Sequence, residues 1–451
     1  MNAGDLLGRL LAKDSTLWPP GNVSPTRLGW LDGAERFRNA VEHLEEFAAS
    51  VEAERILLLG MGGSSLGPLV LSRWAEGRPV EVLDTTAPGE IERATEDLSD
   101  AFIVVSSKSG TTLEVHSLFE HCWSKLPDGS RYAVITDQGS SLDPPDRKPV
   151  HRIFKNDPNI GGRYSTLSQF GLVPAALAGV PLHELLDGAG SVDLEEAVGL
   201  GIAMAEAARD GRDKLTIVGP HEFGLWAEQL IAESTGKHGR GIVPVPVGDE
   251  AEGGADRQHV EVQIGSVRDL GREFYRWMLA TAAAGVVMEI DPFDEPDVGA
   301  AKAATSEALA HLPLPDEGAL PSEDLPAWLA DEVGQGDYVS IQAYIPYGFA
   351  TALEDLRRRC RDLLGGMAVT AGFGPRFLHS TGQLHKGGQN SVVAIQILPP
   401  ERSFDIDIPG KPYGFSTLID AQALGDLRTL RQRGRRVVRV ESCNLDELLP
   451  A

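Results

Sequence analysis

The sequence predicts an α/β protein made of two doubly wound αβα sandwich domains with mostly parallel sheets. Short apolar runs rich in valine, isoleucine and leucine alternate with amphipathic stretches, as expected for parallel strands covered by helices on both faces. This alternation begins near residue 34 and starts again near residue 191, after a stretch containing glycine and serine. The chain has 451 residues, which suffices for two or three domains of about 150 residues each.

The first domain is assigned to residues 34–190, after an irregular N-terminal segment at 1–33. An amphipathic helix is expected at 34–53. The strands are expected at 56–60, 80–84, 102–106 and 132–137, and the helices between them at 64–75, 89–97 and 111–125. Because these strands are apolar along their whole length, helices must cover both faces of the sheet.

The second domain is assigned to residues 191–451, including a C-terminal extension. Its strands are expected at 214–219, 241–247, 286–291, 338–344 and 392–398, and its helices at 193–209, 221–235, 267–286, 297–310 and 350–364. Residues 312–336 are rich in proline and acidic residues, which predicts a surface connection or a mobile flap.

The composition restricts the classes of partner. Asp and Glu (66) outnumber Lys and Arg (41), which gives a formal net charge of −25. Such a charge repels nucleic acids and anionic membranes, so we expect neither as a partner. The three cysteines, Cys122, Cys360 and Cys443, lie far apart and predict neither a disulfide framework nor a metal site. Without a long apolar segment, the protein is expected to be cytoplasmic.

The first functional signal is the glycine-rich stretch LLLGMGGSSLGP at residues 57–68, where a buried strand leads through glycines into a helix. Backbone N–H groups and a helix N-terminus at such a place favour an oxyanion. A dinucleotide site is one alternative, since Asp84 ends the next strand, and a purely structural turn is another. Ser65 replaces the last glycine of the dinucleotide fingerprint, which weakens the first alternative.

The second signal is SSKSGTT at residues 106–112, where hydroxyl groups gather at the carboxyl end of a strand just before a helix. N-capping would explain one or two hydroxyls but not this many. Such a loop suits a terminal phosphate better than a pyrophosphate bridge. The predicted substrate-binding residues of the two loops are Gly63, Ser64, Ser107, Lys108, Ser109, Thr111 and Thr112.

Five motifs occur in the order and with the character of one enzyme family: GMGGSSLGP, SSKSGTT, GGRYSTLS, QLIAESTGK and DPFDEPDVGAAK. On these motifs the chain resembles the glucose-6-phosphate isomerases, a family built from two sugar-isomerase (SIS) domains. The segments DSTLWPPG…RLGWLDG and FGPRFLHSTGQLHKGG also resemble the isomerase half of bifunctional transaldolase/glucose-6-phosphate isomerases. The chain lacks the length for an additional transaldolase barrel, which typically needs about 250 residues.

The resemblance implies that Glu233 is the general base. Trp226, Leu230 and Glu233 fall at helical spacing, so Glu233 extends the apolar stripe of a helix that Gly236 is expected to end. A carboxylate on such a stripe is partly desolvated, which raises its pKa and suits a base. Gln229, one turn earlier on the same face, is expected to orient the substrate or the base.

Arg163 and Lys302 are the other catalytic residues that the resemblance implies, besides a histidine. Arg163 follows two glycines and is expected to stabilise the developing enediolate. Lys302 matches the active-site lysine of the family, but Glu295 stands seven residues earlier where the family usually has glutamine, so the role of Glu295 stays open. Taken alone, Arg163 also fits a structural ion pair and Lys302 a solvated helix position.

The ring-opening histidine is assigned to His259, because GGADRQHVEVQ resembles the GxxxQH segment of the family. His379 and His385, which accompany Lys386 in FLHSTGQLHKGG, are alternatives. Histidine is the side chain most often used for general acid–base catalysis. The segment around the two alternatives also fits a subunit-interface or substrate-capping loop.

The implied reaction is the reversible isomerisation of glucose 6-phosphate and fructose 6-phosphate through a cis-enediol, in glycolysis and gluconeogenesis. No cofactor or metal is implied, and the expected partners are a small sugar phosphate, a second copy of the chain and a separate transaldolase. Two alternatives stay open: an isomerase that also accepts mannose 6-phosphate, and a non-catalytic SIS protein that binds sugar phosphates.

Overall fold

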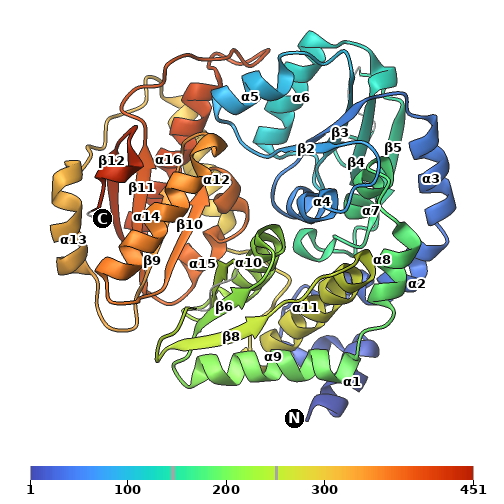
Figure 1. Cartoon of the computed structure of the whole chain (residues 1–451), viewed down its shortest axis with the longest axis horizontal. Coiled ribbons are helices and arrows are strands. Elements are labelled where there is room, and N and C mark those ends of the chain that lie inside the picture. The colour runs from blue at the N-terminus through green and yellow to red at the C-terminus, as the bar shows by residue number, and fades with distance from the viewer. Residues whose placement is uncertain (1, 144–147, 249–251, 450–451) are drawn as a thin grey trace.

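The strands form three sheets in this computed structural model, which describes residues 2–143, 148–248 and 252–449 (Figure 1). In each sheet, neighbouring strands run parallel. The first sheet has the order β2-β1-β3-β4-β5. Its strands are Arg55–Leu59 (β1), Val80–Leu83 (β2), Ala101–Ser106 (β3), Tyr132–Asp137 (β4) and Arg152–Asn156 (β5). The predicted α/β class with mostly parallel sheets is confirmed.

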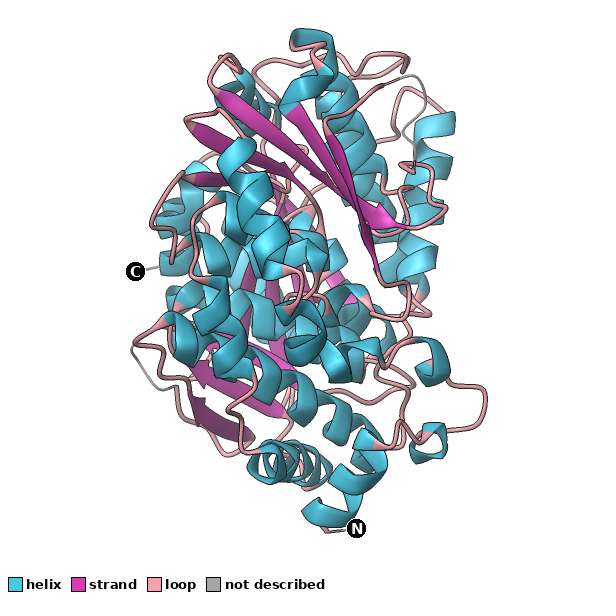
Figure 2. Cartoon of the chain, turned by 90° about the vertical axis from the view of Figure 1, so that its right-hand side faces the viewer, coloured by secondary structure: helices cyan, strands magenta, loops and turns pink. Residues whose placement is uncertain are grey.

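Helices cover both faces of the first sheet, as Figure 2 shows. Alternate residues of β1 enter different cores: Ile56 and Leu58 pack with residues of α3, α4 and α7, whereas Leu57 and Leu59 pack with residues of α5 and α6. Each fully buried leucine contributes about 1.5–3 kcal/mol. The helices of this half are Val41–Ser50 (α3), Leu66–Ser72 (α4), Pro88–Thr95 (α5), Leu113–Lys125 (α6), Gln169–Leu177 (α7) and Leu182–Ala189 (α8).

The second half of the chain contains two sheets, whereas the sequence predicted one doubly wound domain there. The strands Lys214–Val218 (β6), Val243–Val247 (β7) and Arg257–Glu261 (β8) form a sheet of order β7-β6-β8. The strands Tyr338–Ala343 (β9), Val369–Phe373 (β10), Val392–Leu398 (β11) and Arg436–Glu441 (β12) form a sheet of order β10-β9-β11-β12. Val243 and Val245 share a core with Tyr338 and Val392, so the two sheets pack together. The domain limits near residues 34 and 191 stay predictions.

The helices of the second half surround these sheets and join them to the first half. They are Leu194–Arg209 (α9), His221–Thr235 (α10), Val267–Met288 (α11), Val298–Ala310 (α12), Leu325–Glu332 (α13), Ala350–Leu363 (α14), Gly382–Gly387 (α15) and Phe415–Gln432 (α16). Helix α11 packs on α8 and α9, and α10 lies at the centre, between α4 and α15 (Figure 1). No helix of the described ranges is long and apolar enough to span a membrane.

The N-terminal segment is less irregular than predicted. Residues Ala3–Leu11 form helix α1, which Asn2 caps by accepting a hydrogen bond from the Asp5 backbone N–H at 2.8 Å. Leu6 and Leu10 are fully buried, and α1 packs on α9. A short amphipathic segment with two buried leucines is stabilised by tertiary packing, which the local sequence does not reveal.

Three further predictions are corrected. The expected helix at 34–53 is two helices, Gly33–Arg38 (α2) and α3. The expected strand at 286–291 is not a strand: residues 286–288 are the last turn of α11, which ends where Glu289 adopts a left-handed φ of 56°. Residues 312–336 contain helix α13, whose Leu325 and Leu329 are fully buried, so this segment is not only a surface connection.

Candidate active site

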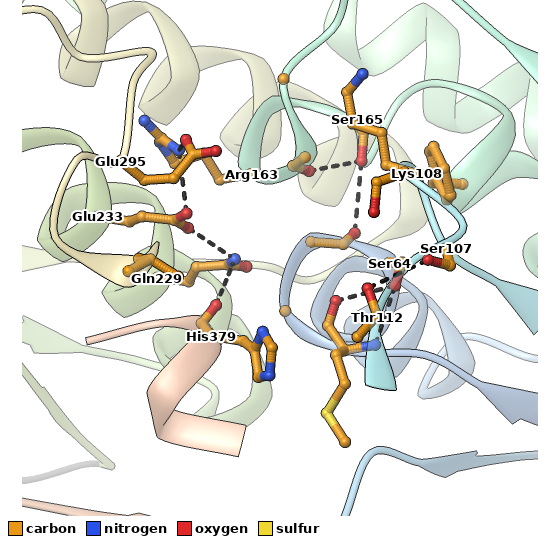
Figure 3. A pocket seen from close by; sticks show the side chains of 18 of the residues that line it. Ser64, Ser107, Lys108, Thr112, Arg163, Ser165, Gln229, Glu233, Glu295 and His379 are labelled. Carbon is orange, nitrogen blue, oxygen red and sulfur yellow. Dashed lines mark hydrogen bonds and ion pairs between the residues drawn. The ribbon is translucent and has the colours of Figure 1, made fainter. Parts of the chain in front are cut away.

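A cavity of about 460 Å³ lies where the loops after β1 and β3 face helices α10 and α12 (Figure 3). Each predicted substrate-binding residue lines it: Gly63, Ser64, Ser107, Lys108, Ser109, Thr111, Thr112 and Gln229. Of the predicted catalytic residues, Arg163, Glu233 and Lys302 line the same cavity. The parallel sheet explains part of this arrangement, because the carboxyl ends of β1 and β3 meet at one edge.

The glycines of the first loop allow it to approach a neighbouring loop closely. A Cβ atom on Gly63 would lie 2.0 Å from the carbonyl oxygen of Gly162, just before Arg163. Gly62 has a φ of +56°, which favours glycine. The Ser64 hydroxyl accepts a hydrogen bond from the Met61 N–H at 3.0 Å and donates to the Ser106 carbonyl at 2.9 Å. Ser64 therefore links the first glycine-rich loop to the start of the second, hydroxyl-rich loop.

The second loop presents hydroxyls at the N-terminus of α6. Ser107 Oγ donates to Thr112 Oγ1 at 3.2 Å, and the hydroxyls of Ser109 and Thr111 lie 2.9 Å apart. Thr112 is the N-cap of α6, but its side chain bonds to Ser107 and not to the first turn. The backbone N–H groups of that turn are thus available to an anion, which the helix dipole also favours. The Lys108 ammonium forms an ion pair with Asp137.

Arg163 is held rigidly inside the site and is 4% exposed. Its Nη1 lies 3.1 Å from Glu233 Oε1 and 3.2 Å from Glu295 Oε2. Its Nη2 donates to the carbonyl oxygens of Pro292 and Asp294, each at 2.8 Å. A guanidinium with this many partners has a fixed position, so its charge is preorganised toward the cavity.

Glu233 lies in the last turn of α10 and is largely buried. Burial raises the pKa of Glu233 above its ordinary value. The positive charge of Arg163 lowers this pKa in part, and the nearby carboxylate of Glu295 raises it further. Gln229 Nε2 donates to Glu233 Oε2 at 3.0 Å and to the His379 carbonyl at 2.9 Å. A carboxylate with a raised pKa and a fixed orientation meets the requirements of a general base near neutral pH.

His379 lines the cavity, and His259 does not. His259 is exposed on β8, the edge strand of the three-stranded sheet, so within a single copy of the chain it does not lie with the other predicted site residues. His385 is buried beside Ser340 and Gln342, and burial lowers its pKa to about 3. Of the three candidate histidines, the structure brings only His379 to the site.

Glu114 is a site residue that sequence reasoning missed. His379 Nε2 lies 2.8 Å from Glu114 Oε1, which also accepts a hydrogen bond from Gln422 Nε2 at 2.6 Å. Burial alone would raise the pKa of Glu114, but the charges of His379 and Lys302 bring it below its ordinary value. The sequence offers one signal for Glu114: it is a glutamate in the first turn of the helix after the hydroxyl-rich loop. The same position is also explained by the favourable charge of a carboxylate at a helix N-terminus.

Lys302 is exposed on α12 and lines both the main cavity and an adjoining cavity of about 140 Å³. Glu114 and His379 line the smaller cavity as well, so these three titratable groups lie together. Glu295, whose role the sequence left open, is half exposed and pairs with Arg163. In the described ranges, no group of three or more His, Cys, Asp or Glu residues is arranged to hold a metal ion.

Curated relatives match about half of the chain. It is 29% identical over 264 residues to a probable glucose-6-phosphate isomerase of Methanococcus maripaludis, covering 52% of this chain and 58% of that protein. It is 32% identical over 240 residues to a probable glucose-6-phosphate isomerase of Haloarcula marismortui, covering 48% and 53%. Half of the chain is homologous to glucose-6-phosphate isomerases. The match spans little more than half the length of these relatives.

The fold agrees with this homology. A solved glucose-6-phosphate isomerase from Chlamydia trachomatis superimposes with a TM-score of 0.52 at 18% identity, covering 62% of this chain and 74% of that one. The two proteins share the α/β fold with parallel sheets. No family model matches the sequence.

Proposed function

We propose that this protein is an enzyme that interconverts glucose 6-phosphate and fructose 6-phosphate. The observation that carries the proposal is the pairing of Glu233, a buried carboxylate with a raised pKa, with the fixed guanidinium of Arg163 at 3.1 Å. Both groups line the same cavity as a hydroxyl-rich loop at a helix N-terminus. An anion-binding loop and an acid–base group in one cavity suit the isomerisation of a phosphorylated sugar.

The phosphate binds at the second loop in this proposal. The hydroxyls of Ser107, Ser109, Thr111 and Thr112 and the N–H groups of the first turn of α6 supply its hydrogen bonds. Binding energy from the phosphate then positions the reacting carbons, which lie at the other end of the sugar. Gln229 is the candidate for a sugar hydroxyl, because its buried Oε1 has no hydrogen-bond partner among the described residues.

Glu233 moves the proton between the two carbons. It removes the proton from C2 of the open-chain aldose, and the electron pair of that C–H bond forms the C1=C2 double bond of a cis-enediolate. The negative charge that develops on the oxygens is stabilised by Arg163. After the remaining hydroxyl proton moves from the C2 oxygen to the C1 oxygen, Glu233 returns its proton to C1 and the ketose forms.

Ring opening is assigned to His379, with Lys302 beside it. An acid must protonate the ring oxygen while a base accepts the proton of the anomeric hydroxyl. The carboxylate of Glu114 lies 2.8 Å from His379 Nε2 and orients the imidazole for this proton transfer. His379 thus takes the role that the sequence assigned to His259.

A coupled assay with fructose 6-phosphate and no added metal tests the proposal. Formation of glucose 6-phosphate by the full chain supports it, and its absence at high enzyme concentration contradicts it. Mannose 6-phosphate, assayed in parallel, separates a strict isomerase from one with dual specificity. Binding of fructose 6-phosphate without any turnover would instead favour a non-catalytic sugar-phosphate-binding protein.

The remaining expectations are part of the same proposal. We infer a role in glycolysis and gluconeogenesis in the cytoplasm, as a homodimer, with a separate transaldolase as a further partner. A dinucleotide is disfavoured as the ligand, because Ser65 replaces the last glycine of the dinucleotide fingerprint and the hydroxyl-rich second loop suits a terminal phosphate.

A further inference from the structure

We propose that Arg27, which the sequence motifs did not single out, binds the phosphate group of the substrate together with Lys108. Arg27 lines the same cavity as the two loops. This inference rests on the proposed function, because it identifies the substrate as a phosphate monoester and assigns Arg27 to its charged end.

The backbone around Arg27 is fixed against the loop that leads to Arg163. Leu28 forms an antiparallel β-bridge with Ile160, and the Gly29 N–H donates to the Asn159 carbonyl at 2.9 Å. A Cβ atom on Gly29 would lie 2.8 Å from Asp157 Oδ2 and 3.1 Å from the Asn159 carbonyl oxygen, so the lack of a side chain on Gly29 favours this close approach. Because the next two residues, Leu28 and Gly29, are anchored, Arg27 lies on a rigid segment beside the cavity.

The positive charge of Arg27 has no carboxylate partner within the described ranges. Its Nη1 donates only to uncharged acceptors: the Thr26 carbonyl at 2.7 Å, the Thr26 hydroxyl at 3.2 Å and the Pro158 carbonyl at 3.5 Å. Arg163 and Lys108, in contrast, are ion-paired. An unpaired guanidinium lining a cavity, in a chain of net charge −25, indicates a site for an anionic group.

Arg27 and Lys108 meet at one carbonyl group. Lys108 Nζ lies 3.4 Å from the Pro158 oxygen that Arg27 also contacts. The two cationic ends are therefore less than roughly 7 Å apart, within one Debye length at physiological salt. A phosphate dianion placed between them contacts both cations and leaves the other guanidinium nitrogens of Arg27 free for bidentate binding.

This geometry predicts a preference for the dianionic form of the phosphate. The second pKa of a phosphate monoester is about 6, so the monoanion becomes the major form below that pH. With Arg27 present, the affinity for the substrate should fall as the pH drops through this range. Without Arg27 the dianion loses part of its advantage, and the fall becomes shallower.

The test compares Arg27→Gln with Arg38→Gln. Arg38 is a matched control, because it forms a surface ion pair with Asp187 and does not line the cavity. For Arg27→Gln, KM for fructose 6-phosphate and the inhibition constant of inorganic phosphate should both rise by roughly tenfold or more, the effect of losing a charged hydrogen bond. The kcat of this variant should fall by a smaller factor than KM rises, since Arg27 contacts only the non-reacting end of the sugar.

The possible outcomes separate failure of the Arg27 inference from failure of the proposed function. Unchanged KM and unchanged phosphate inhibition in Arg27→Gln would overturn the inference, as would a lower kcat at constant KM. If the wild type binds inorganic phosphate in calorimetry and Arg27→Gln does not, but neither isomerises fructose 6-phosphate, the proposed function fails while this inference stands. Should Arg27→Gln fail to fold, Arg27→Lys keeps the charge but loses bidentate geometry. Its phosphate affinity should fall several-fold, and wild-type affinity would contradict the role.

Discussion

Burial and the charges of neighbouring side chains determine the protonation state of the candidate base. Burial and the nearby Glu295 raise the pKa of Glu233, and the guanidinium of Arg163 lowers it, with a net shift upward from 4.5. A base whose pKa lies closer to the working pH accepts a carbon-bound proton more effectively than an exposed glutamate. Glu295 thus acts on the base through its charge, which is a role that an amide at this position does not supply.

Replacing Glu233 by Gln should lower kcat by roughly a thousandfold, because the proton transfer between C1 and C2 loses its base. Binding of a non-reacting sugar phosphate should persist, since the phosphate loop is unchanged. Steady-state kinetics and calorimetry measure the two effects, and Glu289→Gln, at an exposed carboxylate, is the control. Full turnover by Glu233→Gln would refute the assignment of the base.

Replacing Glu295 by Gln should move the acid limb of the kcat/KM profile to lower pH. The sign follows from the charges: a neighbouring carboxylate disfavours ionisation of Glu233, so its removal lowers the pKa of Glu233 and preserves the base at lower pH. The wild-type limb should lie above pH 4.5, the ordinary value of this carboxyl. A pH series between 4 and 9 checks both statements, and a limb that stays in place or moves upward contradicts them.

At the scale of elements, the site depends on two loops and one helix that touch. Helix α10 orients Gln229 and Glu233 toward the cavity, while buried Trp226 anchors it by donating to Thr166 Oγ1 at 2.7 Å. The first glycine loop packs on the loop that carries Arg163, with no space for a side chain at Gly63. A displacement of either loop would therefore move Arg163 relative to the base.

Gly63→Ala should destabilise the protein by about 1–3 kcal/mol, because the added methyl group overlaps the Gly162 carbonyl. Activity should fall as well, since relief of this clash shifts Arg163. Urea denaturation and the coupled assay measure the two effects. Gly199→Ala in α9 is the matched control: nothing lies within 4 Å of its Cβ position, so it should stabilise the helix by roughly 0.5–1 kcal/mol. Equal stability of the two variants would contradict the packing argument.

At the scale of the whole molecule, the cavity belongs to both halves of the chain. The loops after β1 and β3 form one wall, and α10, α12 and the segment around His379 form the other. A ligand that contacts both walls adds binding free energy only in the folded state. The cations in the cavity also oppose the net charge of −25 locally, so the cavity favours an anionic ligand more than the rest of the surface does.

Fructose 6-phosphate should therefore stabilise the chain against unfolding, by about 2.7 kcal/mol at a concentration of 100 times Kd. Thr112→Ala should reduce this gain at a fixed ligand concentration, because it removes one hydroxyl from the phosphate loop. Urea denaturation with and without ligand provides the measurement. Equal stabilisation by fructose and by fructose 6-phosphate would argue against phosphate recognition.

Local features of the site could be predicted from the sequence. Hydrophobic runs such as ILLLG and FIVVS identified β1 and β3 within one residue, because a strand buried on both faces is apolar along its length. The phosphate-loop residues directly follow such strands, so their place at one edge of the sheet was predictable, whereas Glu233 was singled out by the family resemblance. Strands without this signal were missed: β8 is partly exposed at an edge, and β12 is interrupted by arginines.

The sequence by itself determined the α/β class, the two hydroxyl- and glycine-rich loops and the helix that carries Glu233, because each depends on neighbours within a few residues. Only the tertiary structure decided that His379 reaches the cavity and His259 does not. It also decided that Glu114 contacts the His379 imidazole, and that Arg27 and Lys108 meet at the Pro158 carbonyl. The physical reason is that these contacts join residues far apart in the chain. They depend on how α6, α10 and the N-terminal segment pack, and local sequence patterns carry no information on that packing.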